Sequence, residues 1–213
     1  MTPAEIIVEA RKLLQDTRIP FRYSDTELLG YVNQTLKRVL TIRPDLFTQT
    51  SLVPLQPGDV LQSLPADAHR LVDIYYVDGY NSVNEVERPV FERAYPQWVS
   101  DAAGIPLNFI RHARNPTKFF VYPRPVEGLS LVAEYVATPT NYDLNDDILA
   151  PGAGYFSAVV DGVVFLASSI DDEHVSSGRA KLFLDSFLQA LSTDLQSRIV
   201  TDDEEPSVSD NRR

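Results

Sequence analysis

The chain has 213 residues, of which 44% are hydrophobic and 23% are charged, a balance ordinary for a folded protein that buries its own core. It has no cysteine, which excludes disulfides, thiol nucleophiles and iron–sulfur clusters. The net charge of −11 opposes binding of DNA or anionic lipid over the whole surface. No apolar run reaches the ~20 residues of a membrane span, and the early Glu5 and Glu9 argue against a signal peptide.

Two helices are predicted in the first 45 residues. Each begins with a capping box, Thr2 with Glu5 and Ser24 with Glu27, in which two side chains satisfy the free backbone N–H groups of the first turn. Apolar residues then recur at helical spacing, and Pro44 ends the second helix. Because the connection between the helices is short, we expect an antiparallel hairpin.

The apolar period shortens to two between residues 48 and 140. Turn signals such as Pro57-Gly58-Asp59 and Asn115-Pro116 separate short runs that are typical of strands. Strands are predicted at 51–55, 59–63, 70–77, 107–113, 117–122 and 129–137, with a short helix near 90–100. The last three strands are expected to form a meander of two hairpins.

Two of these strands carry consecutive apolar residues, Ile74–Val77 and Phe119–Tyr122. Side chains alternate between the two faces of a strand, so both faces of these strands carry apolar groups. We expect the second face to meet a helix, another sheet layer or another molecule.

Helical periodicity returns towards the C-terminus, with one helix from about Phe156 to Ala167 and another from about Ala180 to Leu195. The fold class is therefore predicted to be α+β. Residues 1–47 and 141–200 would form an antiparallel helical bundle, and 48–140 an inserted antiparallel β module. The polar tail 201–213 has little to bury, and we expect it to be extended and disordered without a partner.

The sequence contains no recognisable catalytic motif. Neither His69, His112 nor His174 has a second ligand at helical or strand spacing, and no phosphate-binding loop or nucleophile elbow is present. We therefore predict no catalytic residue, no metal and no cofactor.

One local charge asymmetry stands out. No acidic residue occurs from residue 102 to 126, whereas Arg111, Arg114, Lys118 and Arg124 are all basic. Either this is a solvated hairpin face, or it is a contact patch for an acidic partner, a neighbouring subunit or passing nucleic acid.

Residues 21–47 resemble the opening helical region of head-to-tail connector proteins, also called adaptors, of tailed bacteriophages. The positions that carry the resemblance are Tyr23, Ser24, Asp25, Glu27, Leu28, Leu29, Tyr31, Asn33, Arg43, Pro44 and Asp45. Residues 64–74, and the pair 119–125 with 133–140, are similar to later strands of that family.

The resemblance implies a non-enzymatic structural protein of the virion neck, between capsid vertex and tail, assembled in the host cytoplasm. Such proteins form a ring, typically of twelve copies, that extends the DNA channel. The implied partners are other copies, the portal protein, a tail or nozzle protein, and double-stranded DNA that passes without sequence-specific binding; no membrane is implied. The C-terminal segment of related adaptors reaches into the portal, which makes portal-contact candidates of Pro206, Val208, Asn211, Arg212 and Arg213.

Two other interpretations remain open. The chain could be a tail terminator or tail-tube completion protein, which would form a ring of another symmetry that touches only tail subunits. It could also be a small-molecule enzyme with a site built from scattered carboxylates, which would be a monomer with a closed polar pocket.

Overall fold

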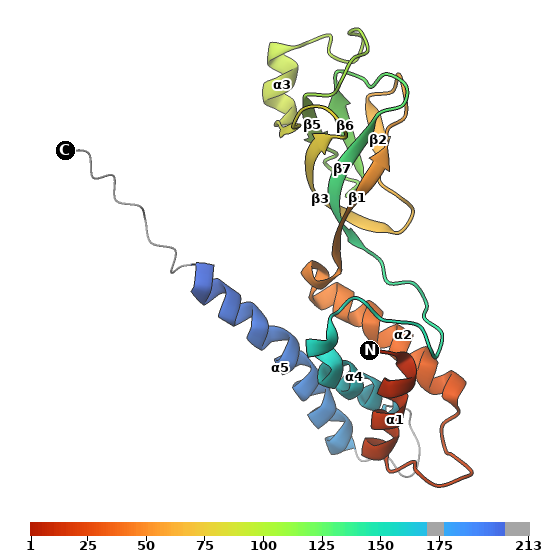
Figure 1. Ribbon diagram of the computed structural model, residues 1–213. Coiled ribbons are helices and arrows are strands. Elements are labelled where there is room, and N and C mark those ends of the chain that lie inside the picture. The colour runs from red at the N-terminus through yellow and green to blue at the C-terminus, as the bar shows by residue number, and fades with distance from the viewer. Residues whose placement is uncertain (170–176, 203–213) are drawn as a thin grey trace, which may run out of the picture. The chain divides into compact units, whose positions relative to one another are not determined.

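The computed structural model describes residues 1–169 and 177–202. The chain divides into two compact units, a helical unit of Met1–Leu46 with the chain from Thr140 onward, and a β unit of Phe47–Pro139 (Figure 1). The fold class is α+β, as the sequence predicts.

The helical unit is built around one apolar helix. Its elements are α1 (Pro3–Leu14), α2 (Asp25–Ile42), the 3-10 turn η2 (Ala153–Tyr155), α4 (Phe156–Ser168) and α5 (Ser177–Asp202). Helix α4 contacts α1, α2 and α5 (Figure 1). Its only charged residue is Asp161, and Val159, Val160, Val163 and Val164 are all buried. A helix that is apolar on nearly all sides must be covered on nearly all sides, which explains its central position. The antiparallel bundle arrangement itself stays a prediction.

Both predicted capping boxes form. The Thr2 hydroxyl accepts a hydrogen bond from the backbone N–H of Glu5, and the Glu5 carboxylate accepts one from the backbone N–H of Thr2. Ser24 and Glu27 repeat the arrangement at α2. No helix in the described part of the chain is long and apolar enough to cross a membrane.

The β unit, described without gaps, contains two sheets that face each other. Its strands are β1 (Thr48–Pro54), β2 (Leu61–Ser63), β3 (Ala68–Val77), β4 (Asn84–Glu85), β5 (Asn108–Arg111), β6 (Lys118–Tyr122) and β7 (Ser130–Ala137). One sheet has the order β1-β7-β3, and the other has the order β2-β6-β5-β4. Leu131 and Tyr135 of the first sheet share one buried core with Phe109 and Phe119 of the second. Strand β1 begins where β7 ends, with Thr48 paired to Val136. The 3-10 turn η1 (Pro44–Phe47) precedes β1.

The predicted meander is wrong in its second half. Strands β5 and β6 form the expected hairpin, but β7 joins the other sheet and pairs with β1 and β3. Pro123 and Pro125 follow β6, and because proline has no N–H the chain leaves the ladder there. The purely antiparallel prediction is also wrong at one place, since β4 pairs with β5 in parallel.

The apolar run on β6 is buried on both faces within the β unit. Phe119 and Val121 enter the core between the sheets. Phe120 and Tyr122 pack on the opposite side, against Trp98 and the helix α3 (Arg88–Ala94), which covers that face.

The apolar run on β3 is covered on one face only. Ile74 and Val77 are buried, whereas Tyr75 and Tyr76 are 40% and 44% exposed. A register shift between Ile74 and Tyr76 interrupts the regular alternation of side chains at this point. The second face of this strand is therefore open to solvent in the single chain.

Candidate interaction surfaces

The first group of predicted family positions surrounds a buried arginine on α1. Arg11 is only 7% exposed, and its guanidinium donates hydrogen bonds to the carboxylates of Asp16 at 2.6 Å and Asp25 at 2.7 Å. It also donates to the backbone oxygen of Tyr23 at 2.8 Å. The Tyr23 hydroxyl donates to the carbonyl oxygen of Ala167 on α4 at 3.0 Å. Tyr23 and Asp25 therefore tie α1, α2 and α4 together.

The next positions form the start of α2. The hydroxyl and backbone N–H of Ser24 both donate to the Glu27 carboxylate and hold its pKa below the ordinary value of 4.5. Leu28 is fully buried, and Leu29 and Tyr31 are half-buried against the same core. Burial raises the pKa of the Tyr31 hydroxyl, because the phenolate would lose its hydration.

The last family positions join the end of α2 to α5 through the buried side chain of Arg43. Arg43 is fully buried and donates to both carboxylate oxygens of Asp45, at 2.9 Å and 2.7 Å. Arg43 also donates to the carbonyl oxygen of Leu191 on α5, at 2.7 Å. Because Pro44 starts the turn η1 between them, Arg43 and Asp45 face each other and join the end of α2 to α5.

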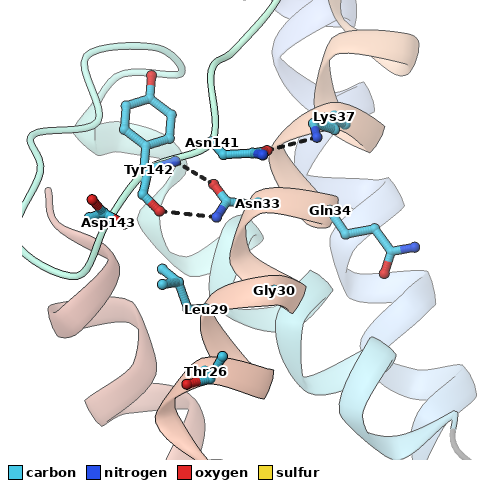
Figure 2. A pocket seen from close by; sticks show the side chains of 9 residues that line it. All are labelled: Thr26, Leu29, Gly30, Asn33, Gln34, Lys37, Asn141, Tyr142 and Asp143. Carbon is cyan, nitrogen blue, oxygen red and sulfur yellow. Dashed lines mark hydrogen bonds between the residues drawn. The ribbon is translucent and has the colours of Figure 1, made fainter.

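One side of α2 forms the wall of a groove of about 550 Å³ (Figure 2). Asn33 lies across it: its side-chain nitrogen donates to the Tyr142 carbonyl at 3.1 Å, and its side-chain oxygen accepts from the Tyr142 N–H at 2.8 Å. Lys37 donates to the side chain of Asn141 at 2.8 Å. The groove lining consists of Thr26, Leu29, Gly30, Asn33, Gln34, Lys37, Asn141, Tyr142 and Asp143. The Asn33 side chain thus pairs with the backbone of Tyr142, as a neighbouring strand would, and holds the segment around Tyr142 against α2.

The four predicted basic positions of the β unit have different surroundings. Arg111 is exposed but held by contacts within the unit: it forms a salt bridge with Glu85 at 2.7 Å and donates to the carbonyl oxygens of Leu71 at 3.0 Å and Val72 at 2.5 Å. Its role is to join β5 to β3 and β4. Arg124 is half-buried, and its Nε has no hydrogen-bond partner among the described residues.

Arg111 and Lys118 lie beside a pocket of about 210 Å³ together with His112 and Arg70. Arg114 precedes the turn at Asn115 and Pro116, which also line this pocket. Sequence reasoning missed Arg70, because it belongs to β3 of the other sheet and reaches the pocket only through the packing of the two sheets. No local pattern around residue 70 signals that placement.

The portal-contact candidates Pro206, Val208, Asn211, Arg212 and Arg213 lie outside the described residues. Helix α5 continues to Asp202, so the first two residues of the predicted tail belong to a helix. Over residues 1–169 and 177–202, no three His, Asp or Glu side chains come together as a metal-ligand set.

Comparison with known proteins gives one family. The family model described as SU10 adaptor protein matches residues 1–211, which spans the helical unit, the β unit and most of the tail. A search of curated proteins finds no match to the chain. The chain therefore belongs to the SU10 adaptor protein family, and this confirms its resemblance to the head-to-tail adaptors of tailed phages.

Proposed function

We propose that this protein is a non-enzymatic structural component of the phage neck, an adaptor that forms a ring, joins the portal to the tail and extends the DNA channel. The observation that carries the proposal is the family match over residues 1–211, because it includes both units and most of the tail rather than a single common module. In this role the protein works by binding other virion proteins through its surfaces.

The open face of the β1-β7-β3 sheet supports ring formation. Leu52, Val132 and Tyr76 occupy one row across the three strands, and Leu52 and Tyr76 are 56% and 44% exposed. Exposed apolar side chains that lie side by side favour association, since burying apolar surface is worth about 25 cal/mol per Å². A subunit contact would cover this row in the ring.

The C-terminal helix supports attachment to the portal. Arg43 holds α5 at Leu191, and α5 continues to Asp202. We propose that Pro206, Val208, Asn211, Arg212 and Arg213 contact the portal. The net charge of −11 supports a channel that lets DNA slide, because it opposes tight binding to phosphate.

Reconstitution on purified portal tests the proposal. The full chain and a variant that ends at Glu205 would be mixed with portal rings and imaged by electron microscopy. We expect the full chain to add a ring of portal-matched symmetry, and the truncated chain to keep its circular dichroism spectrum but to leave the portal bare. A six-fold ring that binds only tail subunits would replace the proposal with a tail terminator. A chain that stays monomeric beside the portal would overturn it.

A further inference from the structure

The pocket beside the β5-β6 hairpin has unpaired positive charge in an otherwise acidic protein. We call it the basic pocket and define it by Arg70, Arg111, His112 and Lys118. Within the part of the chain that the structure describes, no salt bridge is formed by Arg70, by Lys118 or by the nearby Arg114. Arg111 is paired with Glu85, whereas the pocket lining in the described structure includes no carboxylate.

Two residues of the basic pocket, Arg111 and His112, are held in place by hydrogen bonds. Arg111 is held by two carbonyl oxygens of β3 and by Glu85. The Nδ1 atom of His112 accepts hydrogen bonds from the backbone N–H groups of Arg114 at 3.2 Å and Asn115 at 3.0 Å. The proton of the neutral imidazole is therefore on Nε2, which leaves that atom as a donor. Such preorganised donors cost little entropy when an anion binds.

The size and lining of the basic pocket favour a carboxylate side chain over DNA. Its volume of about 210 Å³ is that of a few side chains, and Leu71 and Pro116 give it apolar walls. A duplex presents phosphates along a stiff backbone, which a recess of this size does not admit, and the net charge of −11 repels it. The carboxylate of an acidic residue would meet the positive charges of the basic pocket, and its methylene groups would contact the apolar walls.

The chain itself contains a matching segment. Asp202, which is the last residue of α5, begins a run of four consecutive carboxylates with Asp203, Glu204 and Glu205. We propose that the basic pocket of one copy binds the acidic run 202–205 of a neighbouring copy, an inference that rests on the proposed ring. The basic pocket and the acidic run lie at different places on the chain, so their contact between copies is head-to-tail. Such contacts close into a ring when the rotation from one copy to the next divides a full turn evenly. Residues 206–213 then remain available for the portal.

A peptide titration tests the pocket directly. The probe is a peptide of residues 200–206, and its control replaces each Asp by Asn and each Glu by Gln. The single tryptophan, Trp98, reports on the pocket, because it contacts Phe120 edge-on at 5.8 Å and Phe120 stacks on His112 at 5.6 Å. Added to the chain that ends at Asp202, the acidic peptide should change Trp98 fluorescence saturably, more weakly at high salt, and the control peptide should not.

Charge reversal assigns the effect to the basic pocket. Arg70→Glu with Lys118→Glu should weaken peptide binding at least tenfold, as should the milder pair Arg70→Gln with Lys118→Gln. Arg18→Glu with Arg93→Glu changes the net charge equally at two exposed sites outside the pocket, and should leave binding unchanged. Equal binding by all these variants, or displacement of the peptide by a DNA duplex, would overturn the inference.

Ring assembly separates this inference from the proposed function. The Arg70→Glu and Lys118→Glu chain should fail to form rings, and changing residues 202–205 to lysine in the same chain should restore them. Rings that form on the portal without any peptide binding would overturn the inference alone. Peptide binding by a chain that never docks on the portal would overturn the proposed function and support the pocket.

Discussion

Thr35 of α2 lies directly against Gly162 of α4, where a Cβ atom on Gly162 would come within 2.5 Å of the Thr35 methyl group. The ring of Phe187 on α5 would lie 3.2 Å from the same atom. Three helices therefore meet at a position that has room for a hydrogen atom only. Thr35 is 1% exposed, so it has no solvent to move into.

We predict that Gly162→Ala destabilises the helical unit by about 1–3 kcal/mol, because the packed side chains of Thr35 and Phe187 must shift to admit the methyl group. Gly30→Ala is the matched control, since it also lies inside a helix but has nothing within 4 Å of its added Cβ. The control should raise stability by about 0.5–1 kcal/mol through its better helix propensity. Urea denaturation followed by circular dichroism measures both, and equal effects of the two substitutions would contradict the close packing.

We predict that Arg43→Met lowers the free energy of unfolding by about 2–3 kcal/mol. The substitution keeps much of the buried volume but leaves the Leu191 carbonyl without its charged donor. Arg88→Met is the control, because Arg88 and Glu92 form an exposed i,i+4 pair worth about 0.3–0.5 kcal/mol. If both variants unfold at the same urea concentration, Arg43 does not hold α5.

Acid should remove the contribution of the α2 capping box. The pKa of Glu27 is lowered in the folded chain, so this group contributes stability above its unfolded pKa near 4.5 and loses it as pH falls through the folded pKa. Glu27→Gln cannot ionise, and we expect its stability difference from the natural chain to be constant near neutral pH and to shrink below about pH 4.5. Melting temperatures recorded between neutral and acidic pH measure this difference; a constant difference would show that the ionised carboxylate adds nothing to the cap.

Arg111 and Arg114 should respond differently to alanine substitution. Arg111→Ala removes two hydrogen bonds to β3 carbonyls and one exposed salt bridge, and we expect a loss of about 1–2 kcal/mol in the β unit. Arg114→Ala removes an exposed side chain and should change stability by less than about 0.5 kcal/mol. Chemical denaturation monitored by Trp98 fluorescence compares them, and a larger effect at Arg114 would refute the structural role of Arg111.

The helices could be predicted from the sequence because their signals are local. The two capping boxes, the proline after α2 and the apolar spacing of α4 each act within a few residues. Most strand positions and the β5-β6 hairpin could also be predicted, but not strand β4 or the partners of β7. Strand β7 pairs with β1 and β3 because Leu131 and Tyr135 complete a core that residues far away in the chain supply.

The candidate sites show the same limit. The charge asymmetry between residues 102 and 126 indicated the basic hairpin, but Arg70 joins it only through the packing of β3, and Arg111 turns inward to carbonyl groups that carry no sequence signature. Arg43 and Asp45 stood out only through a family resemblance. That Arg43 reaches Leu191 depends on α5, 148 positions further on, and no periodic pattern encodes such a contact.

The pairing of Thr48 with Val136 has a consequence for how this chain can diversify. Antiparallel partners lie about 5 Å apart, so the segment between them begins and finishes at nearly the same point in space. A tight turn could therefore connect these two points at a small cost in loop-closure entropy. The helices on either side would keep their positions. We therefore expect that recombination could replace residues 48–136 by another segment without changing the fold of the helical unit.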